Sequence, residues 1–430
     1  MAFVSVLLLT LLSGLSGGAL SPIGLLTLRG LTLIGTAAWL VGMIHGGRVV
    51  LPPGGALLPL LLLVGWAGVS AVVSPVPLVS LEAFTADLVD LAAVLLGCSV
   101  IRTSVRRIWW LRILLGSAAL LGLYGLTQAL GLGWTPRLTA ARVSSLYFNS
   151  NHYAGFLALL TPLTLALCLN GRGRAGPFRS ACALLSTVLA VSLFLSFSWA
   201  ILPVMGTCAV LLLRSFKAAS LQLPRWSLGL LTAAAALLTV AGLLASPQLA
   251  TGSWKARASE LTGTWVQQSL GSRWLIWLGS AQIIRASPLL GAGPGNFEVS
   301  FTRYRSPTRR SFAEGLTHAE VNYAHNDLLQ VGTAAGVPGM LAFLTFWVMV
   351  LRGGRGRVAT ALRAGLLALL LYGATDCTMT QIPGNALLAY LGAGVLLGTA
   401  PETGMKRCPA PRLKGAGSYI CRSARREDPG

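Results

Sequence analysis

Long apolar segments constrain the fold of this chain more than any other feature. Segment 56–73, ALLPLLLLVGWAGVSAVV, and segment 230–245, LLTAAAALLTVAGLLA, have the length and apolar character needed to cross the hydrocarbon core of a bilayer. Only 10% of the 430 residues are charged, whereas a soluble domain carries about 25%. We therefore expect an all-α, polytopic membrane protein.

Hydropathy and loop composition predict about twelve membrane spans. The expected spans are 3–20, 23–44, 56–73, 84–101, 108–130, 153–170, 181–197, 199–213, 227–246, 335–351, 360–376 and 383–399. The first segment lacks a basic leading region and a clear small-residue cleavage site. We therefore interpret it as an uncleaved span rather than as a signal peptide.

The spans divide the chain into four regions. Residues 1–246 hold the first nine helices, 247–334 form a large loop with an interfacial helix, 335–400 hold the last three helices, and 401–430 form a basic tail. Most lysines and arginines lie in the tail and in short loops on one side of the membrane. The positive-inside rule makes that side cytoplasmic, with both termini on it, and places the large loop on the opposite side.

The net charge of +21 follows this topology, so the expected partner is the lipid bilayer and not nucleic acid. The seven cysteines include no C-x-x-C pair, which supports neither a zinc site nor a redox motif. We expect no metal and no cofactor.

The large loop contains one strong helical pattern, SRWLIWLGSAQIIR, for which Ser272 is the expected N-cap. An apolar stripe suited to the membrane interface follows on one face: Trp274, Trp277, Leu278, Ala281 and Ile284. Arg273 would lie in the first turn, beside unpaired backbone N–H groups. That arrangement favours a phosphate or pyrophosphate ligand, although an interfacial arginine without a ligand is the plainer alternative.

Two further stretches of the large loop follow the helix. The segment 288–297, PLLGAGPGNF, lacks the G-K-[ST] of a phosphate-binding loop, so we predict a rigid turn that returns the chain to the membrane. Arg303 and Arg305 stand beside Phe301 and Tyr304, a combination that suits sugars or lipid phosphates. A solvated basic strip at the headgroups is the alternative.

The stretch VNYAHNDLLQ, residues 321–330, places His325 beside the predicted span that opens near 335. Histidine titrates near neutral pH and can take a proton from a hydroxyl nucleophile. Asp327 or Glu320 would orient the ring. His318 is a weaker candidate for the same role.

Polar groups near other spans complete the set of candidates. Arg142 precedes a span and would meet the same anion, with Asn151 and His152 at the mouth of that helix. Asp87 and Asp90 share one helical face, and Asp376 and Thr378 lie at a span end. Such groups are costly in a bilayer, so they either bind an acceptor, pair with the arginines, or form hydrogen bonds between helices.

Three stretches together resemble the O-antigen ligase and O-antigen polymerase superfamily of bacterial inner-membrane glycan transferases. They are RVSSLYFNSNHYAGFL (142–157), SRWLIW followed by PLLGAGPGNF (272–297), and AHNDLLQ with GVPG (324–339). The resemblance implies a GT-C-like fold and metal-independent, inverting transfer of a glycan from undecaprenyl pyrophosphate to an acceptor hydroxyl. The site and the large loop would lie on the periplasmic face.

The resemblance also assigns roles to residues of this chain. Arg142, Arg273 and His325 match the family's functional arginines and histidine, and His325 is expected to act as the general base. We expect further substrate-binding side chains around them: Arg303, Arg305, Asn326, Asp327 and Asn151.

The resemblance does not separate the members of the superfamily. The acceptor is a lipid A-core sugar for a ligase, another repeat unit for a polymerase, and a protein hydroxyl for some oligosaccharyltransferases. A transporter or flippase is the alternative from another class, favoured by Asp87, Asp90 and Asp376. It predicts internal repeats and helices broken at the membrane midplane, and the sequence shows no convincing repeat.

Overall fold

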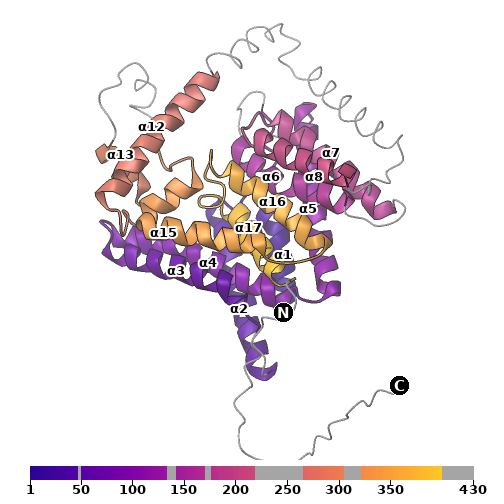
Figure 1. Cartoon of the computed structure of the whole chain (residues 1–430), viewed down its shortest axis with the longest axis horizontal. Helices are drawn as coiled ribbons and strands as arrows, with labels where there is room; N and C mark the ends of the chain where they lie inside the picture. The colour runs from indigo at the N-terminus through magenta and orange to yellow at the C-terminus, as the bar shows by residue number, and fades with distance from the viewer. Residues whose placement is uncertain (47–49, 133–141, 170–175, 218–264, 305–320, 400–430) are drawn as a thin grey trace, which may run out of the picture.

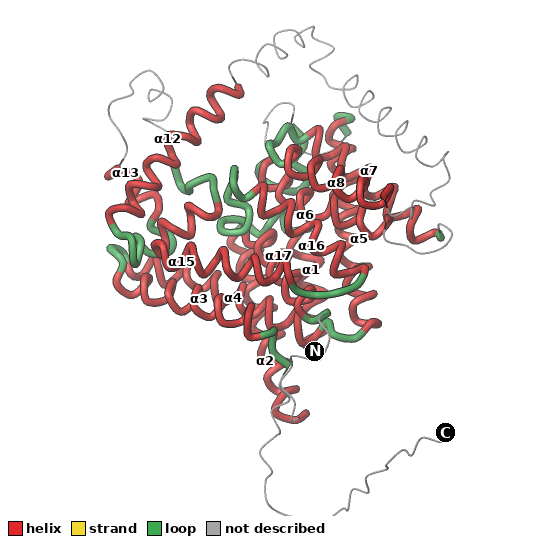
Figure 2. Tube along the Cα trace, in the orientation of Figure 1, coloured by secondary structure: helices red, strands yellow, loops and turns green. Residues whose placement is uncertain are grey.

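The computed structural model describes residues 1–46, 50–132, 142–169, 176–217, 265–304 and 321–399. These residues form helices joined by loops, without a β-strand (Figures 1 and 2). Among them, seven helices are long and apolar enough to cross a membrane: α2 (Pro22–Gly46), α3 (Gly54–Val73), α4 (Pro77–Val100), α5 (Ser104–Ala129), α6 (Ser150–Leu169), α7 (Pro177–Leu195) and α15 (Asp327–Arg352). The all-α, polytopic class is confirmed.

The other described helices are shorter, or carry less apolar sequence. They are α1 (Ala2–Leu15), α8 (Ile201–Lys217), α12 (Trp265–Ala286), α13 (Phe297–Tyr304), α16 (Arg357–Tyr372) and α17 (Pro383–Leu397). Helices overlap eleven of the expected spans, and the span expected at 227–246 lies outside the described residues. The total of twelve crossings therefore stays a prediction.

Helix α6 lies at the centre of the bundle and is buried along almost its whole length. It packs against α16 on one side and α7 on another, while α4 packs against α17 and α3 against α15. Figure 1 shows α12 and α13 set to one side of this bundle, over one end of α15.

Glycines allow the closest of these helix pairs to approach. A Cβ on Gly394 of α17 would collide with the carbonyl oxygen of Val94 on α4, and one on Gly97 of α4 would collide with the carbonyl oxygen of Leu391. Small residues at such crossings let helix backbones pack in a membrane, where apolar burial supplies no driving force between helices.

Helix α15 is interrupted at Ala335 and Gly336, and Gly336 adopts the positive φ of 65° that glycine tolerates best. The span expected at 335–351 corresponds to the part after this break. The preceding turns, which begin at Asp327, form an additional helical segment. Backbone groups freed by the break must find partners, because lipid offers none.

The predicted rigid turn at 288–297 supplies those partners. The amides of Ala292 and Gly293 donate to the carbonyls of Thr333 and Ala334 at 2.7 and 3.1 Å, and the Val337 amide donates to the Pro288 carbonyl at 2.7 Å. From α3, Ser70 donates to the Ala334 carbonyl at 2.7 Å. The turn is therefore a built part of the bundle that fixes α12 against α15.

We predict that Gly394→Ala destabilises the protein, because the new methyl group forces α17 away from α4. Overpacking of this kind costs roughly 1–3 kcal/mol, which would lower the melting temperature of the detergent-solubilised protein. Gly116→Ala on α5 is the matched control, since a Cβ there meets no atom within 4 Å. Equal melting temperatures for the two variants would contradict the close crossing.

Candidate functional site

Four loop segments converge at one end of the bundle, between α12 and the α6–α16 pair (Figure 2). They precede α6, join α7 to α8, precede α15, and join α16 to α17. Hydrogen bonds and ion pairs link their side chains into one network, which contains Arg142, Arg273 and His325. Three motifs that are far apart in the sequence thus form a single candidate site.

Asp376, in the loop after α16, is the centre of this network. Its Oδ1 lies 3.2 Å from Nδ1 of His325 and accepts the Cys377 amide at 2.9 Å. Its Oδ2 accepts the Tyr372 hydroxyl at 3.2 Å and lies 3.7 Å from a terminal nitrogen of Arg273. One carboxylate therefore contacts both the histidine and an arginine of the site.

Asp376 is ionised despite its position in the interior. Burial opposes ionisation, but the hydrogen bond and charge of His325, the charge of Arg273 and the Cys377 amide together hold the pKa of Asp376 below its ordinary value. The side chains of Asp376 and Arg273 are 4% and 8% exposed, whereas that of His325 is 29% exposed. The histidine is thus the member of this triad that reaches accessible space.

His325 is held in an unusual backbone conformation, with a φ of 49°. Side chains other than glycine seldom adopt this left-handed region, and functional sites are enriched in such residues. The indole N–H of Trp277 on α12 donates to the His325 carbonyl at 3.3 Å, and the ring of Tyr323 lies 4.6 Å away between centroids. Because Asp376 engages Nδ1, Nε2 is the ring nitrogen that this carboxylate leaves free of contact.

The two residues after His325 organise the backbone around it. Asn326 is the N-cap of α15: its side chain accepts the Leu329 amide at 3.0 Å and donates to the Ala374 carbonyl at 2.9 Å. Both interactions fix the position at which α15 begins next to the loop that carries Asp376.

Asp327 is 2% exposed and fastens the loop between α16 and α17. Its carboxylate accepts the Met379 and Thr380 amides and the Thr380 hydroxyl, the last at 2.8 Å. Asp327 was expected to orient the imidazole, but the structure gives that contact to Asp376. The reason is local: α15 begins at Asp327, so its side chain turns to residues 379 and 380. Glu320, the other candidate, lies outside the described residues.

Arg142 enters the network from the loop before α6. Its guanidinium donates to the carbonyls of Ser196 and Phe197 at 2.9 and 3.0 Å and to Oδ1 of Asn151 at 2.7 Å. The Asn151 carbonyl accepts the Tyr372 hydroxyl at 3.3 Å, and Tyr372 connects it to Asp376. Burial lowers the pKa of Arg142, and the nearby charge of Arg273 acts in the same direction, yet an arginine remains cationic at neutral pH.

The expected start of the helix that carries Arg273 was wrong. Helix α12 begins at Trp265, seven residues before Ser272, so Arg273 is its ninth residue and not part of its first turn. Backbone N–H groups of an α12 N-terminus therefore do not surround Arg273. Its position depends instead on packing: Arg273 and Ile276 are buried, while Trp274 and Leu278 on the same helix are exposed.

The remaining candidates lie beside the network, apart from it, or outside the described residues, and His152 is the one beside it, near Asp376 and His325. Arg303 is exposed on α13, and Arg305 and His318 lie outside the described part of the chain. His152 is 7% exposed on α6, and no described residue hydrogen-bonds its Nδ1. Tyr372 and Ser198, whose hydroxyls are 2.9 Å apart, belong to the network, although no sequence motif marked them.

Residues 143–344 match the family model described as O-antigen ligase. The match supports the O-antigen ligase and polymerase superfamily that the three sequence motifs resemble. The matched segment contains Arg273 and His325 and begins one residue after Arg142. No curated protein matches the chain.

This family match supports a coarse function for the chain. It is a membrane glycosyltransferase of the ligase or polymerase type, and its apolar helices are those of a membrane protein. The superfamily implies a lipid-linked glycan and a glycolipid acceptor as partners.

We predict that Asp327→Ala destabilises the protein, because it leaves buried amides of residues 379 and 380 without their acceptor. Leaving several buried donors without an acceptor costs on the order of 2–4 kcal/mol, measurable as a lower melting temperature in detergent. Glu298→Ala, at an exposed acidic position on α13, is the control. Unchanged melting of Asp327→Ala would show that the loop is held by other contacts.

Proposed function

We propose that this protein transfers a glycan from an undecaprenyl-pyrophosphate-linked donor to an acceptor hydroxyl, with Arg142, Arg273 and His325 in one active site. The observation that carries the proposal is the convergence of these three side chains, from three distant segments, around Asp376. The superfamily match supports a reaction of the ligase or polymerase type. The identity of the donor and the roles of the residues are part of the proposal.

The positive charge of the network suits a pyrophosphate leaving group. All hydrogen bonds that Arg142 makes with described residues go to neutral oxygens, so they do not compensate its charge. Arg273 and His325 both contact the carboxylate of Asp376. Guanidinium groups fixed in a partly buried site stabilise the charge that develops on phosphate oxygens as the bond breaks.

The Asp376–His325 pair suits general-base catalysis. An ionised Asp376 accepts a hydrogen bond from the Nδ1–H group, so Nε2 of the neutral imidazole is unprotonated and can accept the substrate proton. In the proposed step, Nε2 takes the acceptor's hydroxyl proton while that oxygen attacks the anomeric carbon. The bond from this carbon to the pyrophosphate oxygen breaks, and its electron pair leaves with the pyrophosphate. A single displacement of this kind inverts the anomeric configuration.

The surroundings of the site suit a donor that is half lipid. Trp274 and Leu278 expose apolar surface on the helix that carries Arg273, and tryptophan side chains favour the bilayer interface. We place the site on the periplasmic face of the bacterial inner membrane, with both termini cytoplasmic. A lipid A-core sugar is the proposed acceptor, and a polysaccharide repeat unit or a protein hydroxyl is the alternative within the superfamily.

The test is glycan transfer in proteoliposomes that contain the full-length protein, a lipid-pyrophosphate-linked glycan and a lipid A-core acceptor. His325→Ala is expected to lower the rate by roughly 10²–10⁴-fold, the usual contribution of a general base. His45→Ala, an exposed histidine on α2, is the control and should transfer at the wild-type rate. Near-normal transfer by His325→Ala would overturn the proposed base and direct attention to His152 or His318.

Asp376→Asn tests how the base is oriented. The amide of an asparagine can donate to Nδ1, which would place the ring proton on Nε2 and prevent it from accepting the substrate proton. We expect a loss of about 10²-fold or more in kcat, and little further loss when His325→Ala is added, because residues that act as a unit are not additive. Independent, multiplying losses in the double variant would contradict the pairing.

Arg273→Lys tests the leaving-group contacts. A lysine keeps the positive charge but lacks the planar fork that binds phosphate oxygens in pairs, so we expect a loss of roughly tenfold or more in kcat/KM. Transfer at the wild-type level would show that charge alone is needed at this position.

A further inference from the structure

A cavity with several polar side chains lies inside the helix bundle, on the other side of the loop that joins α16 to α17. It is a cavity of about 250 Å³ bounded by α2, α3, α4, α15 and α17. Most of its lining is aliphatic, with small residues such as Ala67, Ala83 and Ala86. A cavity of this size and lining fits one small ring rather than an oligosaccharide.

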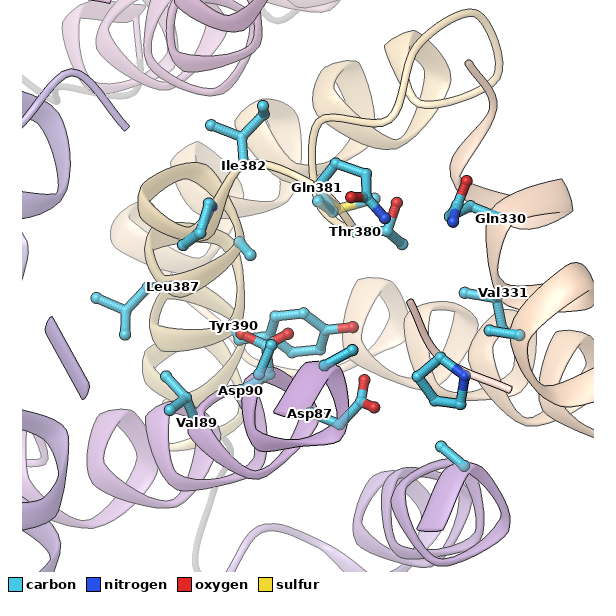
Figure 3. Close-up of a pocket in the computed structure, with 18 of the residues that line it drawn as sticks. Asp87, Val89, Asp90, Gln330, Val331, Thr380, Gln381, Ile382, Leu387 and Tyr390 are labelled. Atoms are coloured by element: carbon cyan, nitrogen blue, oxygen red, sulfur yellow. The ribbon is translucent and has the colours of Figure 1, made fainter. Parts of the chain in front are cut away.

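Polar groups occupy two facing walls of this cavity (Figure 3). Asp87 and Asp90 of α4 and Tyr390 of α17 lie together on one wall. The facing wall carries Gln330 of α15 with Thr380 and Gln381 of the loop. Hydrogen-bond acceptors on one side thus oppose amides and a hydroxyl on the other.

The two carboxylates lie deep in a membrane-spanning helix. Asp87 and Asp90 are the eleventh and fourteenth residues of α4, about 15 and 20 Å along the helix from its start at 1.5 Å per residue. No described lysine or arginine lies within ion-pair distance of either, Arg29 of the cavity lining included. Carboxylates in such a position are costly unless they bind something.

Gln330 connects this cavity to the site around His325. It is 5% exposed, and its side-chain oxygen accepts the amide of Ala324, the residue before His325, at 2.8 Å. Its amide nitrogen turns toward the cavity (Figure 3), and no described residue accepts a hydrogen bond from it. The side-chain N–H groups of Gln330 therefore face the cavity, five residues along the chain from the proposed base.

We propose that this cavity binds a sugar ring of the acceptor, next to the ring whose hydroxyl reaches His325. Sugar hydroxyls donate to the oxygens of Asp87 and Asp90 and accept from the amide of Gln330. The donor's pyrophosphate binds at Arg142 and Arg273, outside this cavity. The inference rests on the proposed transfer function: the two substrates approach His325 from different sides of the loop that joins α16 to α17.

The test is equilibrium binding of an O-antigen-free lipid A-core preparation to the purified full-length protein in detergent. Asp87→Asn/Asp90→Asn is expected to weaken binding by about tenfold or more, because each substitution replaces a carboxyl oxygen that contacts a sugar hydroxyl with an amide NH₂ group. Glu82→Gln, an exposed carboxylate on the same helix, should bind like the wild type. Gel filtration and melting temperature verify that the nearly isosteric variants are folded.

Inorganic pyrophosphate is the second probe. Its binding should be unchanged in Asp87→Asn/Asp90→Asn and weakened in Arg273→Ala, which separates the cavity from the pyrophosphate site. Wild-type affinity of the double variant for lipid A-core, or no lipid A-core binding by the wild type, would overturn the inference.

Glycan transfer by the wild type decides the proposed function separately. If the wild type transfers glycan but Asp87→Asn/Asp90→Asn binds the acceptor normally, only the proposed acceptor cavity is ruled out. If the wild type does not transfer glycan but its lipid A-core binding depends on Asp87 and Asp90, the proposed transfer function is ruled out. The cavity then remains a sugar-binding site.

Discussion

The carboxylate of Asp376 is the interaction on which the site depends. It lies in the interior, where an isolated charge is costly, and it is stabilised because His325, Arg273, Tyr372 and a backbone amide surround it. These partners come from α12, α16 and the loop before α15. One buried anion thus brings a base and a cation together from distant parts of the chain.

The membrane setting explains the irregular backbone that supports this anion. The break in α15 at Gly336 exposes carbonyls that lipid cannot satisfy, and the 288–297 turn pairs with them. That pairing fixes the C-terminal end of α12 against α15. Helix α12 carries Arg273, and α15 begins two residues after His325. Asp327 then fastens the loop of Asp376 to the same helix. The break in α15 and the turn that pairs with it therefore hold the candidate site residues in place.

Local patterns in the sequence predicted most helices, because apolar segments of membrane length depend on neighbouring residues alone. They also marked Arg142, Arg273 and His325. They did not reveal that Asp376 contacts His325, since the two are 51 residues apart and only folding brings them together. Ser272 looked like a helix start, but α12 continues from Trp265 through it. Tyr372 gave no signal, because a tyrosine in an apolar span is indistinguishable from a packing residue.

The stereochemistry of transfer tests the central claim most directly. In the proposed reaction, His325 activates the acceptor on one face of the anomeric carbon, and the arginines bind the pyrophosphate that leaves from the other face. This arrangement requires a single displacement. NMR of the glycan product, compared with a donor of known anomeric configuration, measures whether that configuration changes. The account predicts complete inversion. Retention would require a covalent glycosyl-enzyme intermediate, and it would contradict the role proposed for His325 as the base that activates the acceptor.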